Sequence, residues 1–247
     1  TTARREGDHY VLNGRKMFIT NGPVADLLLV YAKTSPERGQ HGISAFVVEK
    51  GTPGFAVAQS LKKMGWRGSP TGELVFDDCR VPAANLVGGE DAGVRVVMSG
   101  LDIERVFFSG HVIALAQRAL DLSLDYARTR IQFGQPIGSF QLVQGMLADM
   151  YTALESVRAF TYQVLKEIAA AGEAGRGEIH KRSAACVLHA GYMLKTVLDH
   201  AVQIHGGSGF VWDTEVNCLY RAGKLIEIGA GTSQVRQLIV AGELLKG

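Results

Sequence analysis

Hydrophobic positions recur with two different periods along this chain, and the change falls near residue 90. Up to that point, short apolar runs are separated by Gly, Pro and Ser, which is typical of strands joined by turns. Two of the runs flank Asn13-Gly14, a strong hairpin signal. No helix-length segment lies between them, so an antiparallel β-barrel or sandwich is expected. The expected strands cover residues 10–12, 17–20, 27–32, 43–49, 55–61 and 73–81.

From residue 91 onward the apolar residues follow the 3.6-residue period of helices. Three long segments and two shorter ones are separated by short connections, as in an antiparallel four-helix bundle. Ser139 and Thr232 stand where N-caps would open two of the helices. The chain is therefore expected to be an α+β protein, with a β domain over residues 1–90 and a helical bundle over residues 91–247. The expected helices cover residues 94–128, 139–171, 178–205, 215–228 and 232–245.

Composition narrows the classes of function. The 247 residues are 47% hydrophobic and carry a net charge of +2 with both signs interspersed, so no nucleic-acid footprint is expected. The apolar run at residues 26–32 is too short to cross a membrane. Three distant cysteines form no CxxC pair and favour a reducing compartment. The seven histidines include no i, i+4 pair beside a glutamate, so no metal site is expected.

One carboxylate stands among apolar residues at helical spacing. Glu104 is expected on the packed face of its helix, where desolvation would suit it to act as a general base. An alternative is that the helix rotates or bends, which leaves Glu104 half-exposed or paired with a distant arginine. Asp102 has Arg105 at i+3, an ordinary surface pairing. The neighbours of Glu104 one turn away are all apolar: Gly100, Leu101, Phe107 and Phe108.

Two glycine-containing turns follow helical segments. In Ile228-Gly229-Ala230-Gly231-Thr232-Ser233, backbone amides could approach a ligand, and the following helix N-terminus would suit an anion. In His205-Gly206-Gly207-Ser208-Gly209, glycines could likewise admit a ligand or a neighbouring chain. Capping without any ligand is the simpler interpretation of either turn in isolation.

Together, the ordered motifs closely resemble the acyl-CoA dehydrogenase family, and most closely its isovaleryl-CoA type. The resemblance covers nearly the whole chain and implies the family's middle β-domain and C-terminal helical domain, without its N-terminal helical domain. The motifs are Met17-Phe18-Ile19-Thr20-Asn21-Gly22, Met64-Gly65-Trp66-Arg67-Gly68-Ser69, residues 130–137, Phe140-Gln141, His205-Gly206-Gly207-Ser208-Gly209 and Gly231-Thr232-Ser233-Gln234.

The resemblance also implies where the catalytic base lies. Most members carry a glutamate in the turn before the last helix, where this chain has Ala230. Isovaleryl-type members place the base on the first long helix, at the position of Glu104. The implied reaction is FAD-dependent α,β-dehydrogenation of a short or branched acyl-CoA. Glu104 would remove the α proton, and the backbone N–H of Ala230 would donate to the thioester oxygen.

Other site residues carry over by position. Those implied to bind FAD are Phe18, Ile19, Thr20, Arg130, Gln141, Gln203, Ile204, His205, Gly206, Gly207, Thr232, Ser233 and Gln234. Those implied to bind the acyl-CoA substrate are Gln40, His41, Arg95, Asp102, Arg105, Phe108, Ile226 and Gly231.

Four residues depart from the isovaleryl pattern. Phe108 replaces a smaller Leu, and Ile226 replaces an aromatic lining residue, so the acyl pocket is expected to differ in shape. Cys218 and Ala222 stand where the family pattern has a basic and an acidic residue, so salt bridges at these positions are expected to be lost.

The resemblance implies electron transfer to an electron-transferring flavoprotein, a homotetramer, and a place in leucine or fatty-acid catabolism. The implied compartment is the cytoplasm in a bacterium or the mitochondrial matrix in a eukaryote. Alternatives are a long-chain or terpenoid acyl-CoA dehydrogenase, or a flavin oxidase or monooxygenase of the same fold. A further alternative is a truncated, non-catalytic assembly module.

Overall fold

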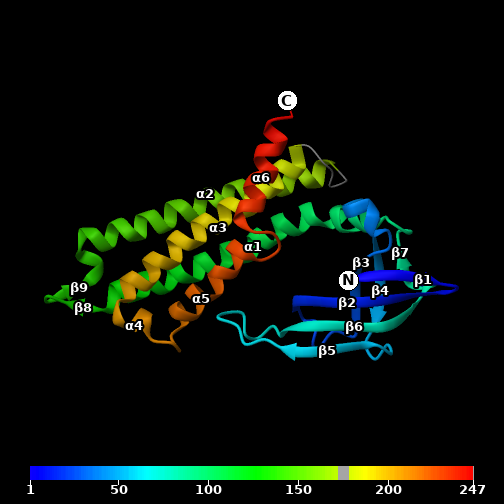
Figure 1. Ribbon diagram of the computed structural model, residues 1–247. Helices are drawn as coiled ribbons and strands as arrows, with labels where there is room; N and C mark the ends of the chain where they lie inside the picture. Colours follow the sequence, from blue (N-terminus) through cyan, green and yellow to red (C-terminus); the bar gives the residue numbers. More distant parts are fainter. Residues whose placement is uncertain (172–177, 247) are drawn as a thin grey trace. The chain divides into compact units, whose positions relative to one another are not determined.

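A computed structural model describes residues 1–171 and 178–246 (Figure 1). The chain forms two compact units, Thr1–Gly100 and Leu101–Gly247. A long helix, α1 (Gly93–Thr129), runs through the boundary between them. Strands make up most of the first unit and helices most of the second, as the change of hydrophobic period predicts.

A seven-stranded sheet forms the first unit, in the order β5-β6-β2-β1-β3-β4-β7 (Figure 1). Every neighbouring pair in the described sheet is antiparallel except β1 and β3, which are parallel. The sheet is therefore mixed rather than wholly antiparallel. Its strands are β1 (Thr2–Glu6), β2 (His9–Thr20), β3 (Leu27–Lys33), β4 (Ile43–Glu49), β5 (Phe55–Ser60), β6 (Thr71–Pro82) and β7 (Leu86–Val87), with 3-10 turns η1 (Pro36–Gly42) and η2 (Ala83–Asn85).

The hairpin expected at Asn13-Gly14 is wrong, because both residues lie inside the continuous strand β2. The pairing of β2 with β6 shifts register between Leu12 and Gly14, and Gly14 has φ of 137°. The glycine therefore serves a β-bulge rather than a turn. Asn13 holds the bulge by accepting from the Asp78 amide at 2.9 Å. The first hairpin instead joins β1 and β2, where Glu6 pairs with His9.

Alternating side chains of the sheet fill its core. Tyr10 and Leu12 of β2 are buried against Phe46 and Val48 of β4 and Phe76 of β6. The ring centroids of Tyr10 and Phe46 lie 4.9 Å apart. Period-two alternation thus places one face of each strand in a common core.

Four helices share the main core of the second unit, which confirms the bundle. The buried residues come from α1, α2 (Gln141–Ala171), α3 (Glu178–His205) and α5 (Glu215–Ile228). A last helix, α6 (Ser233–Leu244), packs against α3 (Figure 1). The smaller elements are β8 (Ile131–Gln132), β9 (Gln135–Pro136), the 3-10 turn η3 (Ile137–Ser139) and α4 (Gly207–Phe210).

The expected limits of α3 and α5 are confirmed at both ends. Thr232 is the N-cap of α6, and its hydroxyl accepts from the Val235 amide. Ser139, however, does not cap α2. It lies in η3, and the helix begins two residues later at Gln141. Pro136 starts this extra turn, and its fixed φ favours such a tight bend.

Candidate active site

The turn between α5 and α6 holds the backbone in a conformation that side chains seldom adopt. Ala230 has φ of 50° and Gly231 has φ of 91°. A positive φ costs a non-glycine residue about 1–2 kcal/mol, so Ala230 is strained. Ala230 is also exposed, and across residues 1–171 and 178–246 no acceptor takes its amide hydrogen. The turn therefore presents an available N–H donor.

A buried arginine lies beneath this turn and donates hydrogen bonds to its backbone. Arg236 of α6 is only 1% exposed and is the largest fully buried side chain among the described residues. Its Nη1 donates to the Ile226 carbonyl at 2.7 Å, and its Nη2 donates to the Gly229 carbonyl at 2.9 Å. Carbonyls at the C-terminal end of a helix have no donor within the helix and favour a cation.

The N-terminus of α6 has a second set of polar contacts. Thr232 Oγ1 accepts from the Val235 amide at 3.3 Å, and Ser233 is buried with its Oγ 3.5 Å from the Glu227 carbonyl. Gln234 is exposed. Of the three residues proposed here as flavin contacts, only Gln234 thus has a fully exposed side chain.

Glu104 does not lie on the packed face of α1, so that expectation is wrong. The side chain is exposed, and among the described residues it makes no hydrogen bond or ion pair. The face of α1 that packs in this unit instead carries Val106 and Ser109, both 0% exposed. Phe107, one turn after Glu104, is 63% exposed. The apolar stripe seen in the sequence is therefore an uncovered surface of this unit, with a carboxylate among its aromatic residues.

Asp102 is buried and Arg105 is partly buried, so they do not form a surface pair, which corrects the second expectation for this helix. Asp102 Oδ1 accepts from Arg105 Nη1 at 3.0 Å and from His180 Nδ1 at 2.8 Å. A carboxylate can only accept here, so His180 carries its hydrogen on Nδ1. His180 comes from α3, 78 positions along the chain, and helical spacing cannot reveal such a partner. Burial of the ion pair is possible because its charges are matched.

The cluster of Asp102, Arg105 and His180, next to Glu104 on α1, lies near Arg236. Burial lowers the pKa of Arg236, and the charge of nearby Arg105 lowers this pKa further. The Nε atoms of both arginines are buried without a partner in the described part of the chain. Asp102 supplies the compensating negative charge on this side. The charge of Arg105 on α1 therefore acts on Arg236 beneath the Ala230 turn.

The expected acyl-pocket residues differ in how far their side chains or backbone are exposed. Ile226 is fully buried in the main helical core, so its side chain reaches no surface of this unit. Phe108 is half-buried and packs on the same core. Gly231 is exposed in the turn. Phe108 and Gly231 are therefore open to contact, whereas the Ile226 side chain belongs to the helical core and only its carbonyl contacts Arg236.

Several expected flavin residues gather where α1 and α3 end. His205 stacks on Tyr126 of α1 with ring centroids 4.4 Å apart, and its Nδ1 donates to the Ala201 carbonyl. Gly206 has φ of 55° and leads into α4 (Figure 1). The other expected residues of this region are Arg130, Gln141, Gln203 and Gly207, all exposed, and Ile204, which is buried.

In the sheet unit, the flavin candidates stand at the irregular end of β2. Phe18 has φ of 61° and is 74% exposed, within a register shift between Lys16 and Ile19. Ile19 packs on the sheet core, whereas Thr20 is exposed. A bulge re-aims a side chain, so Phe18 is turned out of the core face. Its positive φ is unusual for a bulky residue.

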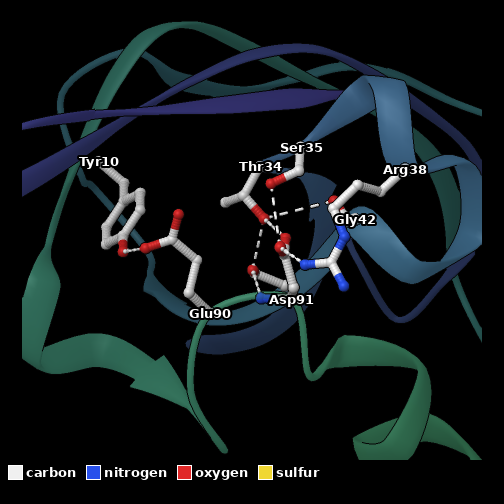
Figure 2. Close-up of polar contacts among 8 residues, drawn as sticks. Tyr10, Thr34, Ser35, Arg38, Gly42, Glu90 and Asp91 are labelled. Carbon is white, nitrogen blue, oxygen red and sulfur yellow. Dashed lines mark hydrogen bonds and ion pairs between the residues drawn. The ribbon is translucent and has the colours of Figure 1, made fainter.

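The loop that carries Gln40 and His41 is fastened at its base to Asp91 (Figure 2). The Asp91 carboxylate accepts from Thr34 Oγ1 at 2.7 Å, Ser35 Oγ at 3.0 Å and Arg38 Nη1 at 2.5 Å. These hydrogen bonds, of which that from Thr34 has the largest effect, hold the pKa of Asp91 below its usual value. Gln40 and His41 themselves are exposed on η1, and so are available to a ligand.

Three further observations concern the remaining substrate candidate, metal ligands and membrane-spanning helices. Arg95, the remaining substrate candidate, is exposed and donates to the Gly88 carbonyl at 3.1 Å. Among the described residues, no three His, Cys, Asp or Glu side chains come together as metal ligands. Within those same residues, no helix has both the length and the apolarity needed to span a membrane.

Sequence reasoning missed Arg236, His180 and Asp91. A signal existed for Arg236, because it stands four residues after the N-cap Thr232, where the helix dipole disfavours a cation. Such a placement indicates a specific partner. The role of His180 depends on a contact between distant helices, and that of Asp91 on a contact between a loop and the sheet.

Comparison with known proteins matches both units. The family model described as "Acyl-CoA dehydrogenase, C-terminal domain" matches residues 91–245, and that described as "Acyl-CoA dehydrogenase, middle domain" matches residues 1–79. An isovaleryl-CoA dehydrogenase of Oryza sativa is 48% identical over 96% of this chain and 57% of its own length. A 2-methylacyl-CoA dehydrogenase of Solanum tuberosum is 46% identical over 99% of this chain and 58% of its own.

Solved structures agree. Butyryl-CoA dehydrogenase of Megasphaera elsdenii superposes with a TM-score of 0.92 at 37% identity, over 99% of this chain and 63% of that one. The chain thus spans less than two thirds of the length of these relatives. With both domain models matched in order and relatives near half identical, the chain belongs to the acyl-CoA dehydrogenase family.

Proposed function

We propose that the protein containing this chain oxidises a short or branched acyl-CoA, of the isovaleryl-CoA kind, to its 2-enoyl-CoA. The observation that carries the proposal is that a hydrogen-bond donor and a carboxylate lie on two different elements of the helical unit. The α5–α6 turn has no acid but a strained, available amide at Ala230, while a carboxylate stands on α1 at Glu104. Arg105, next to Glu104, and Arg236, beneath the turn, lie close enough to influence each other.

In the proposed reaction Glu104 takes the α proton of the acyl group. The electrons of the broken C–H bond move toward the thioester carbonyl, and the Ala230 amide donates a hydrogen bond to its oxygen. FAD, when bound, would accept the β hydrogen with its electron pair, which leaves a double bond between the α and β carbons. Exposed Phe107 and half-buried Phe108 provide apolar surface beside the carboxylate, which would exclude water around the acyl chain.

The residues present suit a flavin. The capped N-terminus of α6 offers backbone donors to a polar, electron-rich group. Phe18 presents an exposed ring from an irregular strand end, as a planar ligand would require. Thr20 and Gln234 would add polar contacts, and Arg130, Gln141 and the His205–Gly207 turn would bind the diphosphate and adenosine portions, partly across a subunit boundary.

The acyl group is proposed from the relatives and from two side chains. Relatives named for isovaleryl-CoA and for 2-methylacyl-CoA are almost equally identical to this chain. Both names describe methyl-branched acyl groups. Phe108 is open to an acyl chain beside Glu104, so it would shorten the pocket compared with a leucine.

The partner and the assembly belong to the same proposal. A structure described as an electron-transferring flavoprotein of Acidaminococcus fermentans superposes with a TM-score of 0.93 at 38% identity. The ground for proposing that electrons pass to such a flavoprotein is membership of the acyl-CoA dehydrogenase family, together with the description of this structure. A homotetramer would cover large exposed apolar residues of the helical unit, such as Phe133 at 90% and Phe210 at 84% exposure. Several relatives are named as mitochondrial, and others come from bacteria, so the compartment would follow the organism.

The test is Glu104→Gln in the full-length protein loaded with FAD. Anaerobic mixing with a panel of acyl-CoA substrates would be followed by flavin bleaching. Loss of a general base lowers the rate by about a hundred- to ten-thousandfold, with flavin content unchanged. Glu155→Gln, on α2, is the matched control and should bleach at the parent rate. Undiminished bleaching in Glu104→Gln would overturn the assignment, and a full-length protein without flavin would favour the non-catalytic alternative.

A further inference from the structure

Arg236 is the feature of the helical unit that the proposed reaction leaves without a role. It is a long cationic side chain, 1% exposed, on a helix whose N-terminal end disfavours a cation. Burying it needs a specific return, because a desolvated charge is costly unless it is fully hydrogen-bonded. Two of its nitrogens are bonded to α5 carbonyls and the third, Nε, has no partner in the described residues.

One of its two acceptors lies in the peptide group that matters for the reaction. Nη2 of Arg236 donates to the carbonyl of Gly229 at 2.9 Å. That carbonyl and the N–H of Ala230 belong to the same peptide group, which is planar. In a trans peptide the N–H points away from the C=O. Fixing the Gly229 oxygen on the buried side therefore directs the Ala230 N–H toward the exposed side.

Further hydrogen bonds restrain the backbone on the N-terminal side of this peptide. Nη1 donates to the Ile226 carbonyl at 2.7 Å, so the guanidinium bridges the last turn of α5 and the strained turn that follows it. The Gly229 amide in turn donates to the Leu225 carbonyl at 2.7 Å. The Gly229–Ala230 peptide is thus held at its oxygen and the preceding Ile228–Gly229 peptide at its N–H, although Ala230 is at φ of 50°.

Charge adds to orientation. A hydrogen bond from a guanidinium to a carbonyl draws electron density toward its oxygen, and hydrogen-bonded groups in series polarise one another. The N–H of the same peptide becomes a better donor as a result. A carboxylate in this place could not do this, because it has no hydrogen to give to a carbonyl.

We propose that Arg236 is a positioning residue for the dehydrogenation: it orients and polarises the Gly229–Ala230 peptide so that the Ala230 N–H meets the thioester oxygen. This inference rests on the proposed function. Arg236 does not touch the substrate and acts only through the peptide group. Its effect belongs to the charged transition state, so it should appear in kcat and much less in KM.

The test compares Arg236→Lys and Arg236→Gln with the parent, in full-length, FAD-loaded protein. Lysine keeps the charge but lacks the planar pair of nitrogens with which arginine reaches the two carbonyls, and glutamine removes the charge. We expect both to lower kcat by about ten- to a hundredfold with little change in KM, within the range known for impaired oxyanion donors. Arg118→Lys is the matched control, because Arg118 also makes two hydrogen bonds, to Glu215 at 2.6 and 2.8 Å, but on the surface.

A second measurement separates orientation from stability. Acetoacetyl-CoA ionises at its α carbon without passing electrons to flavin, so its enolate reports on stabilisation of the oxyanion. In the Glu104→Gln background, the pH at which half of the bound ligand is enolate should rise in both Arg236 variants. The rise is about one pH unit for each tenfold loss of stabilisation. Arg118→Lys should leave this pH unchanged.

Each outcome decides one point. If the parent protein does not lower the pH of enolate formation, the proposed function fails irrespective of Arg236. If the parent lowers it and Arg236→Lys does so equally, the proposed function stands and the positioning role is overturned. If neither Arg236 variant retains its flavin and helical circular dichroism, Arg236 serves the fold as a whole, which also overturns the inference.

Discussion

The turns that end α3 and α5 both need a residue at positive φ, but they differ in how that residue is chosen and supported. After α3 the residue is Gly206, which adopts φ of 55° without steric cost. After α5 it is Ala230, at φ of 50° and at a cost of about 1–2 kcal/mol. Glycine would have been the easier choice, and the neighbouring Gly229 and Gly231 show that the turn admits it.

The support beneath the two turns differs as well. Gly206 is followed by a short helix and flanked by His205, which stacks on Tyr126 near the surface. The Ala230 turn rests on buried Arg236, which is coupled to the Asp102–Arg105–His180 cluster. Strain that is over-determined by buried charges is typical of a functional site. The contrast supports the proposal that the α5–α6 turn is held for the position of its amide.

The largest effect on this contrast is expected from Asp102→Asn. The change leaves Arg105 and His180 without their buried anion, and Arg105 then faces Arg236 uncompensated. Breaking a buried ion pair costs about 3–5 kcal/mol. Urea unfolding followed by helical circular dichroism would measure the loss. Asp125→Asn on the same helix, which breaks an exposed pair with Arg128, is the control and should cost less than about 0.5 kcal/mol. Equal effects would show that the buried cluster gives no special support.

A smaller effect is expected from Gly206→Ala, which gives the α3 turn the residue found after α5. A Cβ at Gly206 meets no atom within 4 Å, so the cost comes from its positive φ alone. The free energy of unfolding should fall by about 1–2 kcal/mol. Gly207→Ala, where φ is not positive and a Cβ likewise has open space, is the control. If Gly206→Ala does not lower the free energy of unfolding, an alanine at positive φ carries no cost in this turn.

The reverse exchange, Ala230→Gly, should have a still smaller effect and of opposite sign. It removes strain of about 1–2 kcal/mol but adds the flexibility of glycine, which costs about 0.5–1 kcal/mol. We expect a net gain in unfolding free energy of less than about 1 kcal/mol, measured by urea unfolding. A loss of stability would show that the exposed methyl group makes a stabilising contact.

The smallest effect is expected in the sheet unit. There the Asp91 carboxylate and its hydrogen-bond partners belong to neither of the two turns. Hydrogen bonds hold the pKa of Asp91 below its unfolded value of 3.8. Its contribution to stability is therefore present above pH 3.8 and is lost as the pH falls through the lower, folded value. The unfolding midpoint should drop over this acid range, and Asp91→Asn should remove that part of the drop. If Asp91→Asn has the same pH profile as the parent, the hydrogen bonds of Asp91 shown in Figure 2 do not contribute to stability.

Much of the fold follows from local patterns. The limits of α3 and α5 and the β-then-α order could be read from hydrophobic period and caps, because these depend on neighbouring residues. The Asn13-Gly14 hairpin could not be excluded, since a bulge and a turn both use positive φ. The parallel pairing of β1 with β3 depends on residues 31 positions apart, Thr2 and Lys33.

The site was less accessible to sequence reasoning. The apolar stripe around Glu104 is real, but whether a stripe is packed or uncovered depends on which elements meet it. Asp102 proved buried because His180 of α3 reaches it. The substitution of acid by alanine at position 230 could be read directly, whereas the positive φ of Ala230 and the contact of Arg236 beneath it are tertiary features.

The central claim is that the carboxylate on α1 and the turn of Ala230 serve one reaction centre. The most direct measurement is anaerobic flavin bleaching by isovaleryl-CoA in the full-length double variant Glu104→Gly, Ala230→Glu. Because either position would present a carboxylate to the α carbon, we predict that the double variant bleaches its flavin measurably faster than Glu104→Gly alone. A folded, flavin-bound double variant as inactive as Glu104→Gly would contradict the account.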